Sequence, residues 1–380
     1  MNFLRFYLYT IILHLTLTGS SFVQIGDAVS IKLDSSIIYT STDNLFRDDS
    51  NKQSDDYFTI VPGVDVSFGQ NDIGLDFNLG VAYDLIRYNE YDQFDDDLLR
   101  FNFSGSSVQN STLDTNFYFS QSEYQSPRSS FDVAGNPDLI KSTQTGYGLV
   151  AEYSYSPKLS FGIGVKGKEL EFDTFANQLA AKESYSIPFD VIYRYSEKLD
   201  VVYGITYMTQ KIGERTYFNR DGYETDSYYF NIGLRGDMLP KLSGQFSVGY
   251  RTLEFSNSNS DREMLGLNSS LNWKLSPKFK SLISLDRKFD AAGSGDTYEL
   301  SRIRVSNSYS INTECFASLN FTYSEKDYNS RTDQMEDISL MLSYVPDYNS
   351  QYTIGFVLVD NQSLIDYKVE EFRLSADFSY

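Results

Sequence analysis

The sequence predicts an all-β protein, a transmembrane antiparallel barrel of up-and-down strands, on three observations. After residue 28 the chain has no run of about 18 apolar residues, so it offers no transmembrane helix. Apolar and polar residues instead alternate with period two, the pattern of a strand with one apolar face. Many of the alternating segments are longer than the roughly 5–6 residues usual in soluble sheets, and they fit a tilted membrane strand of about 9–11 residues with flanks.

Composition excludes several other classes. The 380 residues carry 32 Lys and Arg against 52 Asp and Glu, a formal charge of −20. Nucleic-acid binding needs clustered basic residues, so we expect no nucleic-acid partner. An aromatic share of 16% argues against a disordered chain. His14 is the single histidine of the sequence and Cys315 the single cysteine. The chain therefore has no intramolecular disulfide and few ligands for a metal site.

Residues 1–28 resemble an export signal. Arg5 precedes a mostly apolar stretch over residues 6–17, and small residues follow. This stretch is too short to span a bilayer as an anchor. Cleavage near residues 20–28, after Ser20 or after Ala28, would leave a mature barrel within residues 29–380. The mature chain would then contain no histidine.

The last strand shows the alternation clearly. Phe372, Leu374, Phe378 and Tyr380 are separated by mostly polar residues over 373–379. This places an aromatic and aliphatic row on one face and charged or hydroxyl side chains on the other.

The same alternation predicts about eighteen strands (16–18), an even number that puts both chain termini on the same side of the membrane. The predicted ranges are 30–40, 57–69, 73–88, 96–107, 113–125, 143–155, 159–171, 183–195, 199–211, 225–236, 242–255, 263–275, 279–289, 297–310, 314–325, 335–345, 351–361 and 367–380. Pro62 and Pro188 fall inside two of them, where each removes a ladder hydrogen bond.

The connections alternate between short and long. A turn of the Tyr-Ser-Pro-Lys-Leu type at 155–159 has relatives at 195–199, 239–242 and 275–279, about one hairpin apart. The long connections include 41–56, 126–143, 173–182 and 213–225. Outer-membrane barrels pair tight periplasmic turns with longer external loops in this way. The strands of a soluble sandwich or propeller would also alternate apolar and polar residues. Such a fold would not need long strands whose apolar faces end in Tyr or Phe.

The polar phase of each strand is expected to face the lumen, because a lipid-facing Arg or Lys costs about 2–4 kcal/mol at the midplane. An 18-stranded barrel is wide enough for a water-filled channel. Strands begin about 30 residues into the chain, so we expect no plug domain. The candidate pore-lining residues are Asp76, Asp114, Lys166, Lys168, Arg194, Arg235, Arg251, Lys274, Arg302 and Arg304.

The third external connection, 126–143, is expected to be the longest. It carries Asp132 and Asp138, which would face the basic wall if the loop folded inward to narrow the pore. A solvated loop tip is the alternative.

The C-terminal strand with its aromatic last residue, Tyr380, resembles the β-barrel proteins of the Gram-negative outer membrane. The resemblance implies that Phe372, Leu374, Phe378 and Tyr380 form the signal read by the barrel-assembly machinery, and that the protein resides in the outer membrane. The repeated Pro-Lys turns followed by Tyr-rich strands are similar to a group of β-barrel porins often encoded with exopolysaccharide genes. That similarity implies a pore or an accessory to polysaccharide export.

Two function classes follow from these expectations. The first is a porin-like channel for passive or facilitated passage of small solutes or saccharides; the second is a closed barrel with a structural or surface-interaction role. We expect no enzymatic activity, cofactor or metal centre, because the mature chain lacks the histidine of Ser-His-Asp sites and shows no nucleotide or zinc motif. Outer-membrane lipid and lipopolysaccharide are expected partners, the latter through divalent ions at acidic clusters such as 48–49 and 95–97 unless these are only solvated. The transported substrate and the oligomeric state are left open by the sequence.

Overall fold

The computed structural model describes residues 23–25, 28–70, 74–109, 112–131, 138–256 and 261–380. Within these ranges the chain forms strands and three short 3₁₀ turns, and no α-helix. The strands are β1 (Val23–Ile25), β2 (Val29–Thr42), β3 (Asp55–Gln70), β4 (Leu75–Tyr88), β5 (Asp96–Gln109), β6 (Leu113–Pro127), β7 (Leu139–Ser156), β8 (Leu159–Phe172), β9 (Lys182–Arg194), β10 (Leu199–Ile212), β11 (Tyr223–Leu239), β12 (Leu242–Phe255), β13 (Arg262–Trp273), β14 (Phe279–Ala291), β15 (Thr297–Ser310), β16 (Cys315–Asp327), β17 (Thr332–Asp347), β18 (Ser350–Gln362) and β19 (Tyr367–Ser379). The 3₁₀ turns are η1 (Asp92–Phe94), η2 (Arg128–Phe131) and η3 (Thr216–Phe218).

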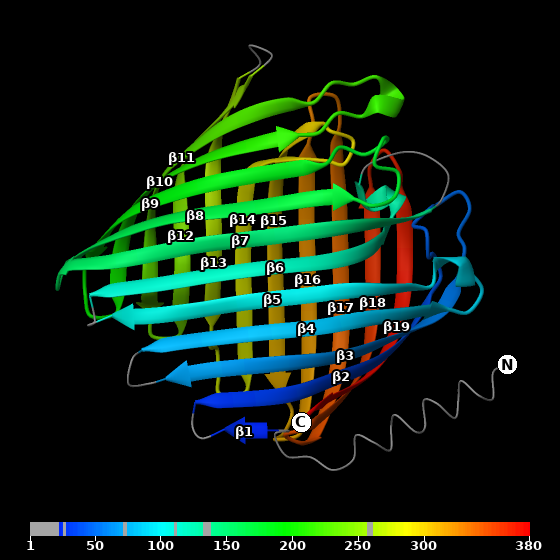
Figure 1. Cartoon of the computed structure of the whole chain (residues 1–380), viewed down its shortest axis with the longest axis horizontal. Helices are drawn as coiled ribbons and strands as arrows, with labels where there is room; N and C mark the ends of the chain where they lie inside the picture. Colours follow the sequence, from blue (N-terminus) through cyan, green and yellow to red (C-terminus); the bar gives the residue numbers. More distant parts are fainter. Residues whose placement is uncertain (1–22, 26–27, 71–73, 110–111, 132–137, 257–260) are drawn as a thin grey trace.

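Strands β2 to β19 form one closed antiparallel barrel of eighteen strands (Figure 1). Each strand pairs with the next, and β19 closes the ring on β2 from Glu371↔Thr42 to Ser379↔Asp34. The backbone of Tyr380 extends this seam through two hydrogen bonds with Leu33. The described residues contain no domain folded inside the barrel, as the sequence predicted.

The short strand β1 lies beside the start of β2, where β19 has already ended. Its three residues pair with Val29, Ser30 and Ile31. Beyond the last β19 pair, β2 would otherwise present an unpaired edge, which sheets generally avoid. β1 therefore continues the seam toward the end of the barrel that carries the short turns.

All eighteen predicted strands are present, with boundaries shifted by a few residues. The ladder between β3 and β4 skips Pro62, and that between β8 and β9 skips Pro188, as expected for residues without an N–H. The expectation that the third external loop is the longest is wrong. Strands β6 and β7 extend into it and shorten it to residues 128–138, whereas the loop between β2 and β3 spans residues 43–54.

The ladders differ in length around the ring. β6 and β7 share fifteen paired positions, from Leu113↔Tyr153 to Pro127↔Leu139. β13 and β14 share only seven, from Leu267↔Arg287 to Trp273↔Ser281. The outer parts of these two strands, residues 262–266 and 288–291, are not paired with each other.

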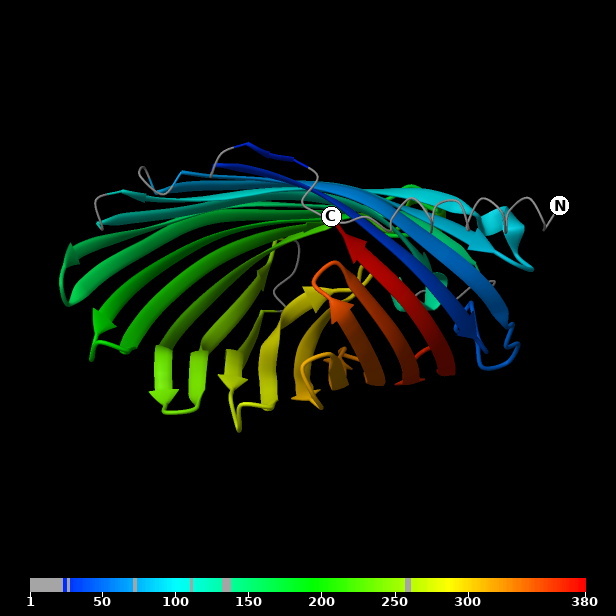
Figure 2. The same cartoon turned by 90° about the horizontal axis from the view of Figure 1, so that it is seen from below.

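Apolar side chains fall into two populations. A broad outer band of large apolar residues is exposed on the barrel surface, including Leu149, Ile163, Ile205, Leu340 and Phe356. The buried apolar clusters, in contrast, all lie toward the end with the long loops. Figure 2 shows the walls of the barrel curling around a common interior. The outer band is the surface that lipid would cover, and the buried clusters tie the loops to the external rim.

Candidate pore and its external mouth

Side chains that face the interior are identified by contacts between strands that are not neighbours. Arg235 of β11 forms a bidentate ion pair with Glu152 of β7, with N–O distances of 2.8 and 3.1 Å. Lys182 of β9 pairs with Asp290 of β14, with 2.6 Å between Nζ and Oδ1. These side chains can meet only across the inner face of the sheet. Directly paired residues on neighbouring strands point to the same face, so the register identifies the inward-facing residues of every strand, which we call the inward phase. The alternate residues, such as Ile163, face outward, toward the lipid.

Nine of the ten predicted pore-lining residues lie on this inward phase. They are Asp76 on β4, Asp114 on β6, Lys166 and Lys168 on β8, Arg194 on β9, Arg235 on β11, Arg251 on β12, and Arg302 and Arg304 on β15. Lys274 instead follows the last residue of β13 and is exposed in the turn that leads to β14.

Several inward-facing charges are open to solvent. Asp76, Asp114, Lys166, Lys168 and Arg304 are all exposed although they point into the barrel. A packed interior would desolvate such groups at a high free-energy cost unless they were paired. Their exposure shows that much of the interior toward the short turns is space for water.

Each sign of charge is in excess on a different side of the interior, although counter-charges occur on both sides, such as Arg373 on β19 and Asp200 and Asp290 on β10 and β14. Inward acidic residues concentrate on strands either side of the seam: Asp34 on β2, Asp65 on β3, Asp76 and Asp84 on β4, Asp337 on β17, and Glu371 and Asp377 on β19. Inward basic residues concentrate on β8 to β15, about half a turn of the ring away: Lys166, Lys168, Lys182, Arg235, Arg251, Lys288, Arg302 and Arg304. A solute in the lumen would therefore lie in a field directed from one wall to the other.

One charged network braces the basic side near the short turns. Arg235 contacts Asp200 at 2.9 Å in addition to Glu152. Asp200 also lies 4.0 Å from Nε of Arg194. The network links β7, β9, β10 and β11, so these two arginines act partly as structural ties within the wall.

Other basic groups are not neutralised. Among the described residues, no carboxylate oxygen comes within 4.0 Å of the side-chain nitrogens of Lys166, Lys168 or Arg304. The guanidinium carbon of Arg251 lies 4.1 Å from the centre of the Tyr229 ring, a cation–π contact. These groups leave positive charge available to solutes in the lumen.

Sequence reasoning missed three of the residues that join distant strands. Glu152 lies on the polar phase of a predicted strand, so parity alone could have found it. Lys182 and Asp290 each fall one residue outside a predicted strand, at 183–195 and 279–289. Extending both strands by one residue would have placed them on the inward phase.

The described part of the third external loop, residues 128–131 with η2, contacts other loops of the mouth. The Phe131 ring packs edge-on against Phe172 of β8, with ring centres 5.0 Å apart. Arg128 lies over the Phe175 ring at 4.3 Å. A Cβ on Gly293, in the loop between β14 and β15, would lie 2.8 Å from Cβ of Phe131. These loop residues therefore contact the neighbouring β8 and the loop that follows it and, across the mouth, the loop between β14 and β15.

The loop between β8 and β9 adds a second connection over the mouth. The amide of Ala180 donates to the carbonyl of Gly293 at 2.8 Å, next to the Lys182–Asp290 ion pair. Leu179 is almost completely buried in the cluster that contains Phe131. The external end of the lumen is thus narrowed by packed loops.

Of the two acidic residues predicted for the constriction, the structure describes only Asp138. Asp138 accepts a hydrogen bond from its neighbour Leu139 through the side chain, and from Arg128 through the carbonyl oxygen, at 2.8 and 3.0 Å. Both contacts lie within or beside the loop itself. Asp132 lies outside the described residues. The inward reach of the loop rests on Phe131 and Arg128, which the sequence did not single out.

Three of the four residues of the predicted assembly signal lie on β19, and Tyr380 directly follows the last residue of that strand. Phe372 packs on Phe356, and Phe378 packs edge-on against Tyr352, with ring centres 5.1 and 6.2 Å apart. Leu374 belongs to the exposed outer band, and Tyr380 joins the seam through its backbone. The described residues contain no group of three His, Cys, Asp or Glu side chains that could hold a metal ion.

Comparison with known families decides the identity of this architecture. The model of the Putative beta-barrel porin 2 family matches residues 35–375, nearly the whole barrel. The chain belongs to this family. This porin is accordingly a protein of the outer membrane, and the family is one of transport channels. No curated protein matches its sequence.

This porin is similar to solved outer-membrane barrels at low sequence identity. OccAB4 of Acinetobacter baumannii aligns over 94% of this chain and 100% of its own, with 10% identity and a TM-score of 0.49. OpdQ of Pseudomonas aeruginosa aligns over 94% of this chain and 99% of its own, with 10% identity and a TM-score of 0.49. The FrpB iron transporter of Neisseria meningitidis aligns over 89% of this chain and 63% of its own, with 10% identity and a TM-score of 0.50.

Proposed function

We propose that this porin is a water-filled channel for small polar solutes, with saccharides as the favoured class. The observation that carries the proposal is the set of exposed, inward-facing charges of both signs, above all Lys166 and Lys168 on β8, Asp114 on β6 and Asp76 on β4. Opposed charges orient dipolar solutes and keep the lumen hydrated, which favours passage of hydrophilic molecules over apolar ones.

Neutral polar groups in the wall support the saccharide preference. A hollow of about 570 Å³ along β3 to β6 is lined in part by Asn78, Ser104, Asn116 and Tyr118. Amide and hydroxyl groups match the donors and acceptors of sugars. The Tyr118 side chain, 41% exposed on the inward phase, offers an aromatic face to the C–H side of a sugar ring.

Electrical recording of the refolded porin in planar bilayers tests the channel directly. We expect discrete conductance steps, and swelling of liposomes in neutral mono- and disaccharides. Replacing both Lys166 and Lys168 by Glu should shift ion selectivity toward cations. The matched control is Lys158→Glu in the exposed turn between β7 and β8, which should leave selectivity unchanged. A correctly refolded barrel that gives no steps would overturn the proposal.

A closed barrel with a structural or surface role is the second candidate, and the packed mouth is the observation that favours it. Ile140, Phe172 and Leu179 form a buried cluster between the loops and the wall, and the partly buried Phe131 packs against it. If these contacts hold the mouth shut permanently, the same recordings stay silent for the native chain, and conductance steps appear only in variants that loosen the loops.

Accessory function in exopolysaccharide export, with assembly by the barrel-assembly machinery through β19, is a finer proposal. The aromatic packing of Phe372 and Phe378 of β19 against β18 supports the assembly part. Deleting the gene and measuring secreted polysaccharide tests the export part, and an unchanged yield argues against it.

A further inference from the structure

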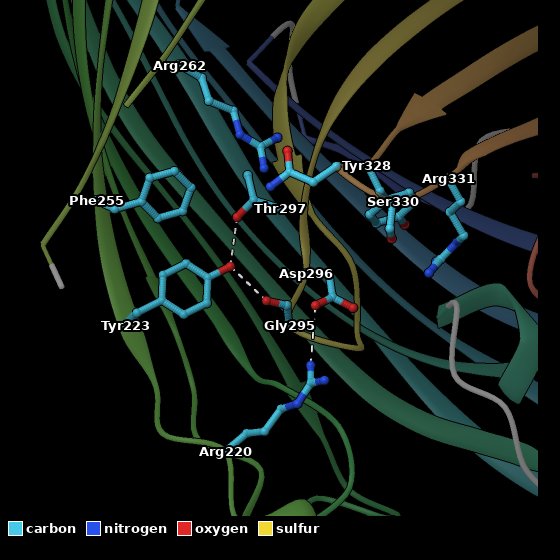
Figure 3. Close-up of a pocket in the computed structure, with 11 residues that line it drawn as sticks. Arg220, Tyr223, Phe255, Arg262, Gly295, Asp296, Thr297, Tyr328, Ser330 and Arg331 are labelled. Carbon is cyan, nitrogen blue, oxygen red and sulfur yellow. Dashed lines mark hydrogen bonds and ion pairs between the residues drawn. The ribbon is translucent and has the colours of Figure 1, made fainter. Parts of the chain in front are cut away.

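A pocket of about 540 Å³ opens between the external loops on the side of the mouth formed by β10 to β17 (Figure 3). Three arginines from three different segments line it. Arg220 comes from the loop after β10, Arg262 from the start of β13, and Arg331 from the loop before β17. Its volume is within the range of about 300–1,000 Å³ typical of small-molecule sites.

The pocket carries excess positive charge in a strongly acidic chain. Among the described residues no carboxylate lies within 4.0 Å of Arg262. Arg220 pairs with Asp296 at 3.3 Å, and both side chains are about half exposed. Arg331 pairs at 2.9 Å with Asp333, which is buried below it. At least one guanidinium group is thus free to take an anionic ligand.

Aromatic rings form a rigid wall beside these guanidinium groups. Tyr223 and Phe255 pack with ring centres 5.9 Å apart. The Tyr223 hydroxyl donates to the carbonyl of Gly295 at 2.7 Å and lies 2.7 Å from Oγ1 of Thr297. The guanidinium carbon of Arg262 lies 5.9 Å from the centre of the Phe255 ring. The tyrosine ring is therefore fixed at both its packed face and its hydroxyl.

This combination matches one ligand chemistry. Guanidinium forks bind carboxylates bidentately, and the negative face of an aromatic ring accepts the C–H face of a sugar. Asn329, Ser330 and Thr297 line the remaining surface and can hydrogen-bond sugar hydroxyls. We propose that this pocket binds a carboxylated saccharide at the entrance of the barrel; the proposal deepens the channel function above and rests on it for its role as an entry site.

The position of the pocket favours a soluble ligand over the acidic sugars of lipopolysaccharide. Tyr223, Phe255 and Arg262 belong to the inward phase of β11, β12 and β13, and the loop residues close over them from the mouth. The outer leaflet meets the opposite phase of these strands. A solute arriving from outside would meet the pocket before it meets the lysines of the lumen.

Calorimetric titration of the refolded porin in detergent micelles tests the site without requiring a conducting channel. The probes are digalacturonic acid and its neutral counterpart galactobiose. We expect the acidic disaccharide to bind at least tenfold more tightly. Arg262→Gln should weaken its binding by about tenfold or more, the effect of losing a charge-assisted hydrogen bond. Arg220→Gln should have a smaller effect, because the charge of Arg220 is already paired with Asp296.

The matched control is Lys158→Gln, which removes one positive charge from an exposed turn at the far end, and it should bind as the native chain does. Equal binding of the two sugars, or no change in Arg262→Gln with folding verified by gel mobility, overturns the proposal. Displacement of the probe by purified lipopolysaccharide would assign the site to the membrane surface and overturn the solute role. If the acidic disaccharide binds but the bilayers stay silent, the pocket proposal stands and the channel function is overturned. If the bilayers conduct but the disaccharide does not bind, the channel function stands and the pocket proposal is overturned.

Discussion

The division of each strand into a lipid face and a lumen face can be tested on two adjacent residues of β8. Val165 lies near the middle of the strand and is 51% exposed on the outer side, paired with Leu149, which is 54% exposed. Lys166 is exposed on the inner side. Val165→Lys would place an ammonium group near the bilayer midplane, at a cost of about 2–4 kcal/mol. Lys166→Leu removes a charge that has no ion-pair partner among the described residues, and should change stability by no more than about 0.5 kcal/mol.

Equilibrium unfolding in urea, with the barrel in lipid vesicles, measures both variants. With a slope of about 2 kcal/mol per molar urea, the predicted loss moves the midpoint of Val165→Lys down by about 1–2 M and leaves that of Lys166→Leu nearly unchanged. If both variants keep the native midpoint, the outer face does not contact lipid. If Lys166→Leu is the less stable of the two, the inward and outward phases have been assigned the wrong way round.

Three further predictions follow from the mouth, the last strand and β1. Lys182→Met removes the ion pair across the mouth and should raise single-channel conductance or open time, while Lys158→Met should not; identical traces would show that this contact does not gate the mouth. Phe378→Ala should lower the fraction of folded barrel recovered from outer membranes, as judged by heat-modifiable gel mobility, because β19 loses an aromatic contact; full recovery would contradict a role in assembly. Since β1 pairs with β2, we expect the signal to be removed after Ser20, and N-terminal sequencing of the mature protein that begins at Val29 would contradict this.

The fold was predictable because the membrane imposes one rule on every strand. Lipid requires apolar side chains on one phase over the whole crossing, so alternation located even β9, which contains Pro188. The rule weakens beyond the lipid, where both faces meet loops or water. Hence β7 begins at Leu139, four residues before its predicted start, and Ile140 on its inward phase is fully buried.

The candidate site was predictable only in part, for a different reason. Parity assigns a side chain to the inside of the barrel, but it does not say what that side chain meets there. The pairs Lys182–Asp290 and Arg235–Glu152 join strands far apart in the chain, and their geometry depends on how the ring curves. Lys274 shows the local limit, because the strand that was expected to carry it ends one residue earlier, at Trp273.

The short ladder between β13 and β14 sets where the barrel is mechanically weakest. Seven paired positions hold this joint, against nine at the seam where β19 meets β2 and fifteen between β6 and β7. Cooperative opening of a sheet starts where the fewest hydrogen bonds must break. Amide exchange should therefore be fastest along the facing edges of β13 and β14. A pulling force should separate β13 from β14, starting at their external ends, while the seam between β19 and β2 stays paired.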